Sequence, residues 1–177
     1  MFVRPDKVIE SLNVGPSMTV ADFGCGSGHY AIEAGRKVGK SGKVYAIDIQ
    51  KEMLSYVRAQ AQMECLTNIE TIWTDLETAE ATRLKNDSVD LVIISNILFQ
   101  ADDKNAVIGE AKRILKSGGK LAVIEWDIEN LPDKFGPPMG SRIPSKDAKD
   151  FFEGAGFISE KEFNPGDHHY GLVFRKQ

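Results

Sequence analysis

The sequence contains few cysteines and no long apolar run. Only Cys25 and Cys65 are present among 177 residues, which excludes a framework of disulfide bridges and suits a reducing compartment. No stretch approaches about 20 consecutive apolar residues, so we expect no transmembrane helix. The first residues, MFVRPDKVIE, also lack the apolar core of a signal peptide. These features predict a cytoplasmic protein that is not inserted into a membrane.

Positive charge is also in short supply. Lys and Arg number 22 against 26 Asp and Glu, which gives a net charge of -4 and a pI near 5.4. This balance argues against broad electrostatic binding of nucleic acid or of an anionic membrane. The length suffices for one domain with a full core, and the composition is that of an ordinary soluble globular protein. We therefore expect a single domain over residues 1–177, with no nucleic-acid partner.

Segments typical of strands and helices alternate along the chain. After a leading segment (1–14) with a short helix at about 6–12, helices are expected from about 29 to 38, around 53–61, at 103–116 and from Ser145 to about 155. Strands are expected at about 18–23, 43–48, 69–73, 89–94, 120–126, 157–163 and 169–175. Repeated strand–helix units predict a doubly wound parallel sheet covered by helices on both faces.

Three boundaries rest on particular residues. Gly118 and Gly119 are expected to end the helix at 103–116, and Ser145 to cap the last helix. That last helix carries Ala148, Phe151, Phe152 and Ala155 on its predicted inner side. Residues 127–144 contain four prolines and two glycines and are predicted to form a long irregular loop; such loops tend to be functional.

The segment VADFGCGSGHY, residues 20–30, points to a ligand site. A strand ends in Gly24, Gly26 and Gly28, and an amphipathic helix follows at once. Because glycine has no Cβ, the backbone of such a loop can lie directly against a ligand. Asp22 precedes the first glycine, so a carboxylate is expected to face the same site.

Other polar residues follow neighbouring strands. Asp48, Asp75 and the pair Ser95-Asn96 all fall at or just past a predicted strand end. In open parallel sheets, ligands bind beyond the carboxyl ends of the strands. We therefore expect these side chains to meet the glycine loop at one edge of the sheet.

A nicotinamide-dinucleotide site is one interpretation of this pattern. Residues 26–31 fit G-x-G-x-x-A, and Asp48 lies 20 residues beyond Gly28, where a ribose-binding acid belongs. Against it, Asp22 would bring negative charge near a pyrophosphate, and the chain has no room for a separate substrate domain. It remains an alternative.

The same motifs resemble those of class I S-adenosylmethionine-dependent methyltransferases, in the broad group that includes the ubiquinone and menaquinone C-methyltransferases. DFGCGSG resembles the first motif of that family, AIDIQ its acidic motif and WTDLE its third. DLVIISNILFQ and ILKSGGKLAVIEW resemble the motifs around the fourth and fifth strands. The match covers about residues 15–126. It implies a Rossmann-like, mostly parallel seven-stranded sheet with an antiparallel last strand.

The resemblance also implies S-adenosylmethionine as cofactor and S-adenosylhomocysteine as product. Asp22 would attract the cationic part of the cofactor, Asp48 would accept from both ribose hydroxyls, and Ile49 would pack on the adenine. The implied cofactor residues are Asp22, Phe23, Gly24, Cys25, Gly26, Gly28, Asp48, Ile49, Asp75, Leu76, Ser95 and Asn96. Two of them have local alternatives, because Asp75 could instead cap a turn and Asn96 a short helix.

The acceptor side is less defined. Phe99, Trp126, Arg142 and the loop 127–144 are the expected acceptor contacts, with ordinary packing as the alternative for each side chain. A general base is needed only if the acceptor must lose a proton. His29, His168 and His169 are candidates, and none stands out. No metal site is expected, because two adjacent histidines in a strand point to opposite faces.

The sequence thus predicts an S-adenosylmethionine-dependent methyltransferase that acts on a small molecule by in-line displacement. Residues 95–98 read SNIL, not the NPPY-like motif of many N-methyltransferases, and the N-terminal signature of the quinone enzymes is missing. The alternatives are a binding protein or regulatory subunit that keeps the cofactor site, and a methyltransferase acting on protein or RNA.

Overall fold

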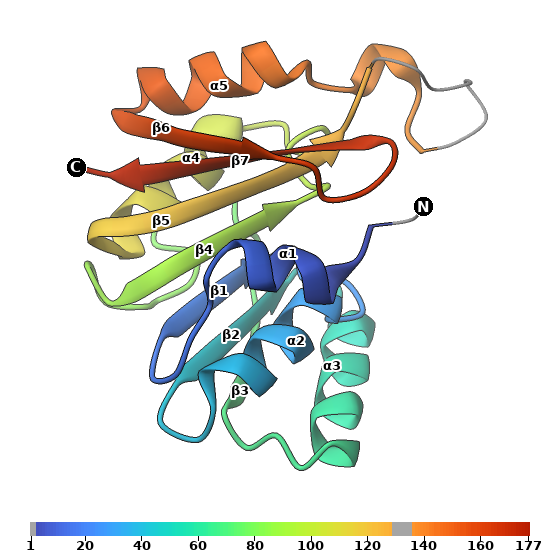
Figure 1. The fold of residues 1–177 in the computed structure, drawn as a ribbon, viewed down its shortest axis with the longest axis vertical. Coiled ribbons are helices and arrows are strands. Elements are labelled where there is room, and N and C mark those ends of the chain that lie inside the picture. Colours follow the sequence, from blue (N-terminus) through green and yellow to red (C-terminus); the bar gives the residue numbers. More distant parts are fainter. Residues whose placement is uncertain (1–2, 129–135) are drawn as a thin grey trace.

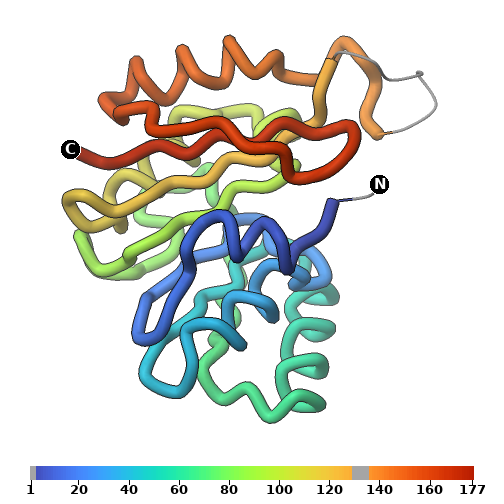
Figure 2. The backbone as a smooth tube through the Cα atoms, viewed as in Figure 1, coloured from blue at the N-terminus to red at the C-terminus, as the bar shows by residue number. Residues whose placement is uncertain are grey.

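A seven-stranded sheet runs through the described part of the computed structural model, residues 3–128 and 136–177 (Figure 1). Its strand order is β3-β2-β1-β4-β5-β7-β6. The strands are β1 (Thr19–Phe23), β2 (Lys43–Asp48), β3 (Ile69–Trp73), β4 (Val89–Ser95), β5 (Leu115–Trp126), β6 (Phe157–Phe163) and β7 (His169–Lys176). Only β7 is antiparallel to its neighbours, and it lies between β5 and β6, as Figure 2 shows. The expected fold class is confirmed.

Helices cover both faces of this sheet. They are α1 (Pro5–Ser11), α2 (His29–Val38), α3 (Lys51–Met63), α4 (Lys104–Ile114) and α5 (Ser145–Gly154), with a short 3-10 helix at Met139–Ser141. One core cluster joins α1, α2 and α3 to the sheet, and a second joins α4 and α5 to its other face. Neighbouring strand residues such as Ile93 and Ile94 enter different clusters, because side chains alternate along a strand. Continuous apolar strands are therefore buried on both faces.

The fourth helix and the fifth strand differ from the expected boundaries. The helix ends at Ile114, and β5 begins at Leu115 and runs through both glycines expected to separate the two elements. Val89 pairs with Leu115 and Leu91 with Lys120, so β5 carries extra residues at an irregularity between these pairs. Gly118, with φ +75°, lies in that extra segment. The glycines therefore bend the strand instead of ending the helix.

The start and inner face of α5 also differ from expectation. Ser145 is the first helical residue, Pro144 occupies the N-cap position, and no side-chain cap hydrogen bond is described there. Proline cannot donate a backbone hydrogen bond, which suits a helix start where that donor would be unused. Phe151 is 46% exposed, whereas Ala148 and Phe152 are buried. The prediction that Phe151 faces inward is therefore wrong.

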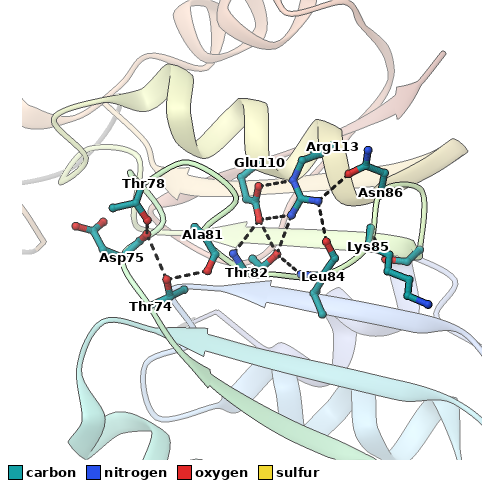
Figure 3. A network of polar contacts seen from close by, with 11 residues as sticks. Thr74, Asp75, Thr78, Ala81, Thr82, Leu84, Lys85, Asn86, Glu110 and Arg113 are labelled. Carbon is teal, nitrogen blue, oxygen red and sulfur yellow. Dashed lines mark hydrogen bonds and ion pairs between the residues drawn. The ribbon is translucent and has the colours of Figure 1, made fainter.

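The connection between β3 and β4 is held by a polar network instead of a helix (Figure 3). Residues 74–88, all of them described, contain turns and irregular backbone but no helix or strand. The buried Glu110 carboxylate on α4 accepts from the backbone amide of Thr82 at 2.9 Å and from its hydroxyl. Arg113 donates to both Glu110 oxygens and to the Leu84 carbonyl. Burial opposes ionisation of Glu110, but hydrogen bonds from Arg113 and Thr82 outweigh it and hold its pKa below the ordinary value.

We predict that Glu110→Gln lowers the free energy of unfolding by about 2–3 kcal/mol at pH 7, because a buried ionic partner is lost. A carboxyl whose folded pKa is lowered stabilises the fold above its ordinary pKa and loses that contribution as the pH falls. The difference between wild type and variant should therefore shrink below about pH 4. Urea unfolding at pH 7 and at about pH 3 measures it, with the exposed Glu162→Gln as control. Equal losses in both variants would contradict the role of Glu110.

Candidate functional site

A cavity of about 540 Å³ opens at the carboxyl ends of β1, β2, β3 and β4. Its walls come from the segments that follow these four strands and from the start of α2. Of the expected cofactor residues, it is lined by Gly24, Cys25, Gly26, Asp48, Ile49, Asp75, Leu76, Ser95 and Asn96. The fold thus brings together residues that are up to 72 positions apart, from Gly24 to Asn96.

Two of the three loop glycines are required by close packing. Gly24 has φ +66°, and a Cβ there would lie 2.2 Å from Ile97 Cγ2. Gly28 has φ +87°, and a Cβ there would lie 2.6 Å from Val57 Cγ2. Gly26 has φ +51°, but its Cβ would meet no described atom within 4 Å. Gly26 therefore presents open backbone to the cavity that it lines.

Asp48 fastens this glycine loop to the end of β2. Its Oδ2 accepts from the Gly26 amide at 2.9 Å, and its Oδ1 accepts from the Gln50 amide at 2.8 Å. The Cys25 amide also donates to the Ile47 carbonyl at 2.9 Å. Asp48 is buried, yet it lines the cavity. It can therefore hold the loop and still meet a ligand, since each carboxylate oxygen accepts more than one hydrogen bond.

Asp22 lies beneath the glycine loop and not on the cavity wall. Its exposed fraction is 1%, and its Oδ2 has no hydrogen-bond partner among the described residues. Burial, together with the charge of Asp48, raises the pKa of Asp22 to about 7, although the Ala31 amide donates to it. Phe23 and Gly28 are buried and also do not line the cavity. These three expected residues therefore take no part in the cavity wall.

Tyr30 is a cavity residue that the sequence did not reveal. It lies in the first turn of α2, lines the cavity and is hydrogen-bonded to Ser95. Burial raises the pKa of its hydroxyl to about 12, so it stays protonated at neutral pH. Its position two residues after Gly28 is the feature of the sequence that could have placed it at the cavity. Tyr30 therefore brings a neutral hydroxyl to the cavity wall near Ser95.

Asp75 and Asn96 each had a local alternative. Asp75 Oδ1 accepts from the Glu77 amide at 2.9 Å, so this side chain caps a turn as well as lining the cavity. Asn96 begins no helix; it has φ +57°, and its buried Oδ1 has no partner in the described residues. The N-cap of the next helix is Asp103, which accepts from the Ala106 amide.

The expected acceptor contacts lie away from this cavity. Trp126 stacks on His169 with ring centroids 4.2 Å apart, and the Arg142 guanidinium lies 5.9 Å from the Trp126 ring. Arg142 is buried and donates to the carbonyls of Pro137 and Asp127. Phe99 packs against the core. None of these three side chains lines the cavity as the described residues form it, and positions 129–135 of the expected loop 127–144 lie outside those residues.

The three histidines occupy different environments. His29 is exposed at the cavity wall, whereas His168 is exposed at the start of the β7 hairpin with φ +74°. Burial, aided by the nearby charges of His168 and Arg142, lowers the pKa of His169 to about 4. His169 is therefore neutral at pH 7, and it packs on Trp126 away from the cavity. No group of three His, Cys, Asp or Glu among the described side chains is arranged to hold a metal ion.

The sequence matches known methyltransferases. A family model described as a methyltransferase domain matches residues 15–153. A demethylmenaquinone methyltransferase of Lactococcus lactis is 32% identical over 115 residues, which cover 65% of this chain and 44% of that protein. The chain spans about half the length of the curated relatives it matches.

Solved structures agree with the family match. A SAM-dependent methyltransferase of Aquifex aeolicus superposes with a TM-score of 0.86 at 27% identity, over 97% of this chain and 89% of that one. The cyclase SpnF superposes with a TM-score of 0.81 at 16% identity, over 97% and 80% of the two chains, and shows the fold alone. Among the helices of the described residues, none has the length and apolar character needed to cross a bilayer.

We predict that Gly24→Ala destabilises the protein by about 2 kcal/mol more than Gly26→Ala. Both variants place a side chain at positive φ, but only the first drives a methyl group into Ile97. Adding Ile97→Ala should recover part of the Gly24→Ala loss, with a coupling energy of about 1–2 kcal/mol. Chemical unfolding of the two single glycine variants, Ile97→Ala and the double variant measures this. Additive losses would show that Gly24 and Ile97 do not pack as described.

We also predict that a buried carboxyl makes folding depend on pH. Asp22 binds its proton more tightly in the folded than in the unfolded chain, so its contribution to stability falls as the pH rises from about 4 to 7. Asp22→Asn should therefore gain stability relative to wild type by about 1.4 kcal/mol per pH unit across this window. Urea unfolding at several pH values, with the exposed Asp75→Asn as control, checks it. A constant difference between Asp22→Asn and wild type would contradict the raised pKa.

Proposed function

Because the chain belongs to the class I S-adenosylmethionine-dependent methyltransferases, we propose that it transfers the methyl group of S-adenosylmethionine to a small-molecule acceptor. The observation that carries the proposal is the single cavity that joins the glycine loop, Asp48, Asp75 and the pair Ser95-Asn96. Its volume of about 540 Å³ lies in the range typical of cofactor sites.

Asp48 and Ile49 would hold the nucleoside of the cofactor. Each oxygen of Asp48 accepts one backbone amide and has capacity for a ribose hydroxyl. Ile49 is 59% exposed at the cavity wall, an apolar surface that an adenine ring would cover. Asp75, which also lines the cavity with Leu76 beside it, would accept from the adenine amino group.

The glycine loop and the segment after β4 would hold the methionine part. The space beside the Gly26 Cα is open, Tyr30 and Ser95 bring hydroxyls, and Asn96 has a buried oxygen with no described partner. Asp22, beneath the loop, would favour the cationic centre through its charge and without direct contact. Bound cation would in turn favour the ionised form of this carboxyl, whose pKa is about 7.

The cofactor supplies a methyl group already activated by positive sulfur. The residues of this chain therefore need mainly to position the acceptor in line, since correct placement alone has a large kinetic effect. His29 is the one histidine that lines the described cavity, and it would serve as hydrogen-bonding group or base only for an acceptor that loses a proton. Phe99, Trp126 and Arg142 would contact an acceptor that extends beyond the cavity.

A small-molecule acceptor is supported by the acidic charge balance, which disfavours nucleic acid, and by the name of the Lactococcus lactis relative. The second candidate is a cofactor-binding or regulatory protein that performs no transfer. It is favoured by one observation: His168 and His169, two of the three histidine candidates for a base, do not line the cavity. A protein or RNA acceptor is the third candidate.

We predict that calorimetry detects binding of S-adenosylmethionine and of S-adenosylhomocysteine, and little or no binding of NAD. Asp48→Ala should weaken cofactor binding by about 1–3 kcal/mol, because buried hydrogen-bond partners are left unmatched. The exposed Glu162→Ala serves as control and should bind as wild type does. Preferential binding of NAD would overturn the proposal, and unchanged affinity in Asp48→Ala would remove Asp48 from the site.

Transfer itself is measured as formation of S-adenosylhomocysteine with a panel of small molecules that includes quinols. Turnover with one of them separates the enzyme from the binding protein. Tight cofactor binding without turnover on the panel would favour the second candidate, and turnover only with protein or RNA the third.

A further inference from the structure

Glu125 is a buried carboxylate at the penultimate position of β5. Its exposed fraction is 1%, and it does not line the cavity. The last residue pair between β4 and β5 is Ser95 with Ile124, and the Asn96 amide still donates to the Ile124 carbonyl at 2.9 Å. Glu125 therefore stands where the backbone after β4 leaves the sheet.

After Asn96 the backbone leaves the sheet, and its next amides no longer pair with β5. The Glu125 side chain lies where it can accept from them. Asn96 has φ +57°, which ends the strand. The Leu98 amide then donates to Glu125 Oε1 at 2.8 Å. The backbone amides of Ile97 and Trp126 lie close enough to this carboxyl to oppose the rise of its pKa. Burial raises the pKa of Glu125 to about 7, but a carboxyl oxygen accepts an amide hydrogen bond in either protonation state. A buried amide without a partner is costly, so the bond to Leu98 matters at either charge. The Glu125 side chain thus supplies the acceptor that a neighbouring strand would otherwise give to the Leu98 amide.

The segment held in this way forms one wall of the cavity. Asn96, Ile97, Gln100 and Ala101 all line it. The Ile97 side chain also packs so closely on Gly24 that no Cβ fits there. The position of Leu98 and Ile97 therefore decides both the cavity wall and the space above the glycine loop.

We propose that Glu125 is a positioning residue that holds residues 96–101, and through Ile97 the glycine loop, in the shape that binds the cofactor. This inference rests on the proposed function for the identity of the ligand. Glu125 acts through the Leu98 and Ile97 backbone and has no contact with the cavity itself. Lys104 on α4 and Tyr170 on β7 are the other titratable groups that face it.

Two variants test this role. Glu125→Gln keeps the size of the side chain but turns one acceptor oxygen into a donor, which would face backbone donors. Glu125→Asp keeps the charge but is one methylene too short for the Leu98 amide. Glu110→Gln is the matched control, because it removes another buried carboxylate that holds a different segment.

Hydrogen exchange of the protein without added cofactor tests whether Glu125 holds the backbone of Ile97 and Leu98. Both Glu125 variants should exchange the Ile97 and Leu98 amides about tenfold faster or more, with β1 amides unchanged. Glu110→Gln should leave the Ile97 and Leu98 amides at the wild-type rate relative to β1. Uniformly faster exchange across β1 and the loop would show a merely structural role and overturn the proposal.

Calorimetric titration with S-adenosylmethionine tests whether this hold on the loop is needed for cofactor binding. Both Glu125 variants should bind about tenfold more weakly or worse. Wild-type affinity in either variant would overturn the proposal. If wild type itself binds no S-adenosylmethionine, the proposed function fails, whereas the exchange rates still decide whether Glu125 holds the loop.

Discussion

The carboxylate of Asp48 joins the two strand ends on which the site depends. It stands at the end of β2 and accepts the Gly26 amide, so the loop after β1 is bound to the neighbouring strand. The Cys25 amide adds a second bond to β2. Three positive-φ glycines give the loop its shape, but glycine alone leaves a loop free to take other shapes. The contact with Asp48 selects one of them.

Two other buried carboxylates also accept backbone amides of the loops around the cavity. Glu110 on α4 accepts the Thr82 amide in the connection that also carries residues 74–77, and Glu125 on β5 accepts the Leu98 amide within residues 96–101. All three carboxylates are at most 6% exposed. Loops cannot satisfy their backbone donors as strands do, and buried acceptors supply what the sheet no longer provides. The site is therefore shaped by buried acids, only one of which lines the cavity.

Much of this architecture could be predicted from the sequence, because its signals are local. The apolar run Val89–Ile94, the glycine loop and the acids that follow the strands identified the sheet, its order of elements and most of the cavity wall. The family and the cofactor were also identified from motifs, and the comparisons confirmed them. Because parallel strands place their carboxyl ends at one edge of the sheet, residues that follow different strands in the sequence could be expected to lie close together.

The features that could not be predicted from the sequence depended on register and packing, which no local pattern contains. The start of β5 follows from its pairing with Val89, and the burial of Asp22 from the loop above it. Glu125 belongs to no motif that assigns it a role, and only the pairing of Ser95 with Ile124 places it against Leu98. The fold packs Trp126 on His169 and holds Arg142 against the Pro137 carbonyl, so their contact with an acceptor stays a prediction.

The central claim is that this cavity holds S-adenosylmethionine by the residues after the first four strands. A crystal structure of the protein with S-adenosylhomocysteine tests it most directly. The account predicts the ribose hydroxyls within hydrogen-bond distance of Asp48, the adenine against Ile49 and the amino-acid end beside Gly26. A ligand bound elsewhere, or bound here without contact to Asp48, would contradict it.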